Sequence, residues 1–161
     1  NIKAVVKKLV DSDEFKKGNG NIELHVDKMI DEAKMKLHKG LITHHDDPQK
    51  GQWKSSAINN ERELKATVIE ETKGLYKINL QLVSTNSKNN PLKNGDLALF
   101  ALHNTFGDLP FKLVKIDKQS AELNFYAYGS FTVGAFVDNG TTELELDLAE
   151  LPNISSHFKI H

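Results

Sequence analysis

The sequence predicts a mostly β protein: an antiparallel β-sandwich of seven to eight strands, preceded by a short α-helical N-terminal region. Three observations carry this prediction. The hydrophobic period is 3.6 residues near the N-terminus and changes to 2 after Arg62. Seven short apolar segments then follow, separated by turn-forming Gly, Asn, Asp or Pro. No helical pattern lies between them, which favours two packed antiparallel sheets over alternating strands and helices.

Two amphipathic helices are expected near the N-terminus, in residues 2–10 and from residue 22 onward. Gly40 stands where the C-terminus of the second helix would need a left-handed residue. Two helices alone make a poor core, so their apolar faces must pack on the sandwich or belong to a larger region. The apolar residues of the second helix are Ile22, Val26, Met29, Ile30, Ala33 and Leu37.

Residues 41–61 lose the helical period and have the composition of a connecting segment. Trp53 is its one large apolar side chain, and we expect it to act as an anchor because an exposed indole is unfavourable. We therefore divide the chain into a helical appendage with its linker, residues 1–50, and a sandwich domain, residues 51–161. Because the chain begins at Asn1, we expect the appendage to be the end of a larger region.

The predicted strands differ in how they should be buried. The segment 96–102 is apolar on both faces and should lie centrally in a sheet. Asp138-Asn139-Gly140 predicts a tight hairpin, since Asn-Gly accepts positive φ. In the last strand Glu143, Glu145 and Asp147 alternate with leucines, and we expect them to face solvent. The other strands are expected at residues 64–68, 75–82, 111–116, 121–128 and 131–137, with the first two joined at Lys73-Gly74.

Composition excludes several classes of protein. The 161 residues carry a net charge of −1 and form no basic stretch, so no nucleic-acid partner is predicted. No apolar run approaches the roughly 20 residues of a membrane-spanning helix, and no signal-peptide pattern is visible. The absence of cysteine fits a reducing compartment, and we predict a cytoplasmic location.

Metal binding and cofactors are not predicted. The segment 44–47, His-His-Asp-Asp, has suitable ligand types. Adjacent histidines rarely converge on one ion, however, and no third ligand follows at a recognisable spacing.

Two stretches carry the candidate functional residues. The first leaves the central strand with His103, Thr105 and Phe106, which can hydrogen-bond an amide and stack on a flat group. The alternative is structural: Phe106 plugs the end of the sandwich and His103 satisfies a loop carbonyl. The second stretch contributes Tyr126, Tyr128, Gly129 and Ser130, where the glycine indicates a bulge or a close approach to the backbone and the tyrosines are candidates for a surface or for edge packing.

These stretches resemble a known family. Leu102-His103-Asn104-Thr105-Phe106 and Tyr128-Gly129-Ser130-Phe131 are similar to the Leu-His-x-Ser/Thr-Phe and aromatic-Gly-x-Phe pair of YEATS domains. Trp53 and the segments 61–68, 84–85, 91–92, 128–135 and 144–152 resemble the prokaryotic YEATS (pYEATS) family more closely. The likeness extends from Trp53 to about Phe158.

The resemblance implies an immunoglobulin-like sandwich with a binding site made by loops at one end. In eukaryotic relatives these loops enclose an acylated lysine. Carried over, His103 and Thr105 would hold the acyl amide, Phe106 and Tyr128 would flank it, and the backbone at Tyr128 or Gly129 would donate to its carbonyl. Two departures are visible: Lys54-Ser55-Ser56 replaces an expected glycine pair, and Tyr128 stands where Trp is often found.

We therefore predict a non-enzymatic recognition or adaptor module of a bacterial conflict or signalling system, fused or bound to an effector domain. Its predicted partner is an acylated lysine, another small amide-bearing ligand, or a protein. The alternative is a protein–protein interaction or oligomerisation domain that uses an exposed sheet edge or the helices. Catalysis by His103 with Ser130 is disfavoured because no buried acid is marked to orient the imidazole.

Overall fold

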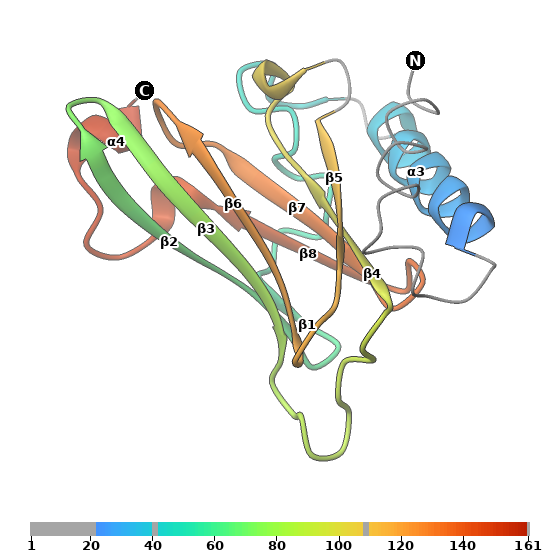
Figure 1. Ribbon diagram of the computed structural model, residues 1–161. Helices are drawn as coiled ribbons and strands as arrows, with labels where there is room; N and C mark the ends of the chain where they lie inside the picture. The colour runs from blue at the N-terminus through green and yellow to red at the C-terminus, as the bar shows by residue number, and fades with distance from the viewer. Residues whose placement is uncertain (1–21, 40–41, 108–109, 161) are drawn as a thin grey trace.

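The structure, a computed structural model, describes residues 22–39, 42–107 and 110–160. Eight strands form two antiparallel four-stranded sheets, one ordered β1-β2-β3-β6 and the other β5-β4-β7-β8 (Figure 1). The predicted mostly β, sandwich-like fold is confirmed. The strands are β1 (Ile58–Asn59), β2 (Arg62–Thr72), β3 (Leu75–Ser84), β4 (Leu97–Ala101), β5 (Phe111–Lys115), β6 (Ser120–Ala127), β7 (Thr132–Val137) and β8 (Thr142–Asp147).

Local turn chemistry sets the two hairpins that the sequence predicted. Lys73 and Gly74 separate β2 from β3, and Gly74 adopts a φ of 80°. Between β7 and β8, Asp138 and Asn139 have φ values of 56° and 57°, the left-handed pair that a primed turn requires. The period of 2 and the turn residues therefore predicted these two hairpins correctly.

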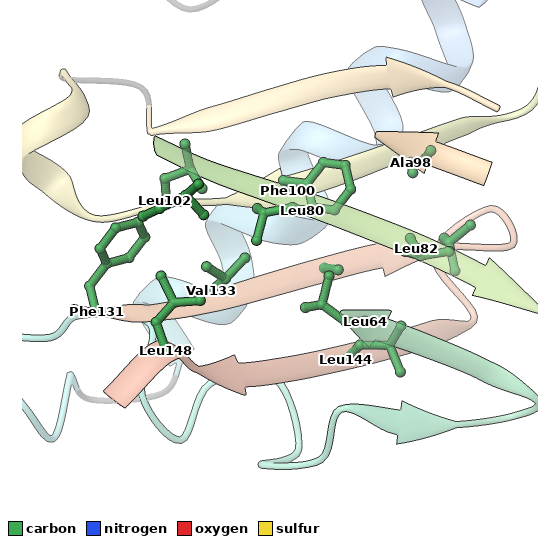
Figure 2. Packing of buried hydrophobic residues seen from close by; sticks show 14 of the residues in the cluster. Leu64, Leu80, Leu82, Ala98, Phe100, Leu102, Phe131, Val133, Leu144 and Leu148 are labelled. Carbon is green, nitrogen blue, oxygen red and sulfur yellow. The ribbon is translucent and has the colours of Figure 1, made fainter. Parts of the chain in front are cut away.

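The main core lies between the two sheets. Figure 2 shows side chains from both layers meeting there, among them Leu80 from β3 and Phe100 from β4. Alternate residues of β4 face opposite ways, since Ala98 and Phe100 belong to this core whereas Leu97 and Leu99 do not. The strand is buried on both faces, as its uninterrupted apolar sequence predicted.

A second core covers the outer face of the β5-β4-β7-β8 sheet. The helix α3 (Ile22–Lys39) packs there in Figure 1. Of the two alternatives left open by the sequence, this helix packs on the sandwich. The helix expected in residues 2–10 lies outside the described residues, and the domain boundary at residue 50 stays a prediction. The second core consists of Val26, Met29, Ile30, Ala33, Trp53, Leu97, Leu99, Ala101, Phe111, Leu113 and Phe136.

The prediction that the acidic residues of β8 face solvent is wrong. Glu143 and Glu145 are only 7% and 8% exposed, so they do not face solvent. The segment 46–60, here called the strap, covers them. Glu145 accepts hydrogen bonds from the N–H groups of Gly51 (3.0 Å) and Trp53 (2.8 Å), and Glu143 pairs with lysines of α3 and the strap. Alternating carboxylates give the same sequence pattern whether they are hydrated or paired, so the pattern could not distinguish the two.

The C-terminal segment closes the core near the β2–β3 turn. It contains the 3₁₀ turn η2 (Leu148–Glu150) and the short helix α4 (Ser156–Ile160). The fully buried ring of Phe158 lies edge-on to Tyr76, with centroids 4.8 Å apart. No helix in the described part of the chain is long and apolar enough to cross a membrane.

Candidate functional site

The two stretches with candidate residues lie at one end of the sandwich. β4 leads into the 3₁₀ turn η1 (Asn104–Phe106), and residues 128–131 connect β6 to β7 across the two sheets. Ala101 near the end of β4 pairs with Gly134 near the start of β7. The loop after β4 and the loop before β7 therefore start side by side, and β4 and β6 both end at the top of Figure 1.

Three phenylalanine rings form a cluster at this end. The ring centroid of Phe106 lies 5.3 Å from that of Phe125 and 5.4 Å from that of Phe131. Phe131 is buried, whereas Phe106 is only partly buried and packs against the margin of the main core. The cluster therefore joins the predicted candidate Phe106 to the core through Phe131, a residue to which the sequence assigned no role in binding.

His103 is held in one tautomer by its partners. Its Nε2 lies 2.8 Å from the carbonyl oxygen of Asp46, which can only accept, so Nε2 carries the proton. The backbone N–H of Thr105 donates to Nδ1, at 3.2 Å, which makes Nδ1 an acceptor. The Thr105 hydroxyl, 2.9 Å from the same Nδ1, then donates its proton to the ring.

This arrangement fixes the hydrogen-bonding character of Thr105. Because its only hydroxyl proton points at His103, Oγ1 offers just its lone pairs to a ligand. The site therefore presents an acceptor at Thr105, suited to an N–H or O–H donor. Asp46, which determines this through its backbone carbonyl, is a residue that sequence reasoning placed in a solvated linker.

The two tyrosines are the exposed members of the candidate set. Tyr126 is 48% and Tyr128 is 76% exposed, so both rings stand at the surface. Among the described residues, no partner accepts a hydrogen bond from the backbone N–H of Tyr128 or Gly129. Gly129 is itself buried, so of these two residues Tyr128 is the accessible one, with its exposed ring beside its backbone N–H.

Ser130 is engaged elsewhere. Its backbone N–H donates to the Phe158 carbonyl (2.9 Å), and its hydroxyl donates to the Lys159 carbonyl (3.1 Å), so it anchors α4 to the loop. Both ring nitrogens of His103 are occupied by Asp46 and Thr105. The hydrogen bonds that a catalytic Ser130–His103 pair would need are thus made to other groups.

The strap supports the loops from the side of the second core. Gln49 donates to the Leu102 carbonyl (2.9 Å) and accepts from the indole N–H of Trp53 (2.7 Å). Asp47 accepts from both the N–H (2.8 Å) and the hydroxyl (2.6 Å) of Thr132. Only Trp53 gave a sequence signal, because polar residues in an irregular segment look the same whether they are solvated or paired.

No metal centre is assembled by the described residues, among which no three His, Cys, Asp or Glu side chains converge. His44 lies 2.9 Å from the Thr43 hydroxyl, and the Asp47 carboxylate is used by Thr132.

Two four-stranded antiparallel sheets with an aromatic-lined loop end define the class of protein: a β-sandwich module with its candidate binding loops at one end. Residues 76–149 match the family model described as the prokaryotic YEATS domain. The predicted family is confirmed. The matched range contains every candidate site residue but not Trp53 or the rest of the strap. No curated protein matches the chain.

Proposed function

We propose that this chain is a non-enzymatic recognition module that binds a small, flat, amide-bearing group at its loop end, with an acylated lysine as the favoured ligand. The observation that carries the proposal is the relay from Asp46 through His103 to Thr105, which leaves Thr105 Oγ1 as a pure acceptor. The match of residues 76–149 to the prokaryotic YEATS family model supports the same assignment.

An amide complements these groups on both sides. Its N–H would donate to Thr105 Oγ1, and its carbonyl would accept from the backbone N–H of Tyr128 or Gly129. The ammonium group of an unmodified lysine can donate hydrogen bonds but cannot accept them, so it would leave the backbone N–H groups of the loop unsatisfied. The arrangement therefore favours the acylated over the unmodified side chain.

The flat part of the ligand would stack on aromatic rings. Tyr128 and the half-buried Phe106 are the accessible rings, whereas the exposed ring of Tyr126 lies on the outer face of β6, away from the core face on which Phe106 packs. Each good aromatic stack contributes about 0.5–1.5 kcal/mol beyond the area buried, so we expect micromolar rather than nanomolar affinity. Ser130 would act indirectly by holding the 128–131 loop on α4.

We further propose that the module works as an adaptor in a bacterial conflict or signalling system, in the cytoplasm, attached to or partnered with an effector domain. The family match supports a YEATS-type module. The conflict or signalling system, the cytoplasmic location and the effector domain follow from the resemblance alone.

Titration calorimetry tests the ligand. Acetyl-lysine and crotonyl-lysine peptides should release or absorb measurable heat, whereas the unmodified peptide should not. Tyr128→Ala should weaken binding at least about tenfold, a loss of roughly 1.4 kcal/mol. Thr105→Val removes the acceptor while Thr105→Ser keeps it, so only the valine variant should lose binding. If no acylated peptide binds, the acyl-lysine assignment is wrong.

A second candidate function is protein–protein interaction or self-association. It is favoured by the packing of Phe106 on Phe125 and Phe131, which makes that ring part of the core rather than a free wall. Under this alternative Phe106→Ala would lower stability without affecting any small ligand.

A further inference from the structure

The four sheet edges differ in how they are protected against pairing with another chain. The β2 edge is capped by β1 at one end and carries a register shift between Glu70 and Thr72 at the other. The β8 edge is covered by the strap, where the Ser56 carbonyl accepts from Glu145 N–H. The short strand β5 contains two lysines among its five residues. Bulges, coverage and lysines are the usual devices that prevent edge-to-edge association.

β6 has none of these devices. It pairs with β3 over eight consecutive residues without a register shift, and it contains no proline or lysine. Within the described residues its only ladder partner is β3, and in Figure 1 it lies at the margin of its sheet.

The hydrogen-bond register identifies which β6 groups face outward. Leu64 N–H donates to the Ala57 carbonyl (2.8 Å), so its backbone groups point away from β3. Its partner Leu82 therefore directs its own groups toward β6, where it pairs with Ala121. In an antiparallel ladder the direction alternates from one residue to the next. Ala121 and every second residue after it bond to β3, and the residues between them point to the open edge.

The outward-facing residues are Glu122, Asn124 and Tyr126. The exchange of backbone bonds between Ser120 and Asp117, on the side away from β3, agrees with this parity. The side chains of these residues lie on the uncovered face of the sheet, where Asn79 donates to Asn124 (2.9 Å) and Gln81 to Glu122 (2.6 Å).

We propose that the β6 edge binds a second copy of this chain by antiparallel β6–β6 pairing about a two-fold axis at Asn124. In this register Glu122 lies opposite Tyr126 of the second copy, and Asn124 lies opposite itself. All three outward residues then exchange N–H···O=C bonds with the partner, because the same parity applies on both sides.

Charge favours this self-pairing. Glu122 is the only charged residue of β6, and the register places no like charge against it. Within one copy Tyr126 pairs with Lys77 of β3. In the dimer Tyr126 also lies opposite Glu122 of the second copy, so Lys77, Tyr126 and that Glu122 follow one another across three adjacent strands, with the two opposite charges on either side of the tyrosine. The amide row of Asn79 and Asn124 continues through the axis. The interface shares Tyr126 with the candidate ligand-binding residues but does not use Thr105, His103 or Tyr128, so variants of those three residues test the ligand without changing the β6 edge.

Disulfide trapping tests the register, since the chain contains no cysteine. In a hydrogen-bonded antiparallel pair the Cα atoms are about 5.5 Å apart, within the disulfide range of about 4.4–6.8 Å. Asn124→Cys should therefore form a covalent dimer under mild oxidation. Asn79→Cys, on the same face but one strand further from the axis, would sit roughly 15 Å from its counterpart and is the matched control. We expect at least about tenfold more cross-linking for Asn124→Cys.

Sedimentation of the unmodified chain gives an independent readout. A single edge pairing buries little area, so we expect a weak dimer whose average mass rises above 18.0 kDa with concentration. Asn124→Pro should abolish the rise without lowering the melting temperature, because the Asn124 N–H points to the open edge and has no partner among the residues that the structure describes. A monomer at every concentration, or equal cross-linking of the two cysteine variants, would overturn the proposal.

Discussion

The indole ring of Trp53 lies directly over Gly134 of β7. A Cβ added at Gly134 would come within 2.6 Å of the indole Cε2, and closer still to Cδ1 and Nε1. The indole N–H is meanwhile fixed by Gln49 at 2.7 Å. Gly134 is therefore small because the ring occupies the place of its side chain, and the strap is positioned by this contact.

Gly134→Ala should destabilise the fold by about 1–3 kcal/mol, the usual cost of overpacking a core. Urea denaturation measures it, and the Trp53→Phe background provides the control. A smaller ring leaves room for the methyl group, so the cost of Gly134→Ala should fall in that background. An equal cost in both backgrounds would contradict the assignment of the clash to the indole.

A second prediction separates the two neighbouring aspartates of the strap. Asp47 accepts both donors of the buried Thr132, so Asp47→Ala should cost about 1–3 kcal/mol. Within the described part of the chain Asp46 contributes its backbone carbonyl, to His103, and no side-chain bond, so Asp46→Ala should change the free energy of unfolding by less than about 0.5 kcal/mol. Paired thermal or urea melts decide the point. Equal losses would mean that the Asp47 carboxylate is not what holds β7 to the strap.

Alanine substitutions of the aromatic residues at the loop end should lower the free energy of unfolding by amounts that follow the burial of each ring. Phe131→Ala removes a ring that is 5% exposed and should cost about 3–5 kcal/mol. Tyr128→Ala truncates a ring that is 76% exposed and should leave stability within about 0.5 kcal/mol. Phe106→Ala should fall between them, since its partly exposed ring packs on Phe125 and Phe131. A loss for Phe106→Ala as large as that for Phe131→Ala would identify Phe106 as a core plug and weaken the binding proposal.

The parts of the fold that sequence predicted are those set by local rules. Alternation defined the strands, the positive-φ turn of Asp138 and Asn139 defined the last hairpin, and the size of Trp53 marked an anchor. At the site, the sequence offered a loop carbonyl as the structural alternative for His103, and its Nε2 does lie 2.8 Å from the carbonyl oxygen of Asp46.

What the sequence could not predict are contacts between distant segments. Gln49 reaches Leu102 across 53 positions, and Trp53 reaches Glu145 across 92. A polar residue in an irregular segment has no period, so nothing in the sequence distinguishes a strap that supports the binding loops from a solvated linker. Long-range pairing of the same kind, between β8 and the strap and α3, buries Glu143 and Glu145, which the sequence led us to expect in solvent.

The last prediction concerns alkaline pH. The hydrogen bond and the charge of Asp147, with Asp47 and Glu150 adding smaller effects, raise the pKa of Lys50 above its ordinary value of 10.5. A lysine with a raised folded-state pKa stabilises fully below the unfolded value, and this contribution is lost as pH rises through the raised one. Lys50 is 42% exposed in its side chain, so screening should hold the effect below about 1 kcal/mol.

Urea melts of the unmodified chain and Lys50→Gln, compared at pH 9 and pH 12, measure this effect. The stability difference between the two proteins should shrink toward zero at the higher pH. A Lys50→Gln difference that persists at pH 12 would mean that the aliphatic packing of Lys50, not its charge on Asp147, ties the strap to β8.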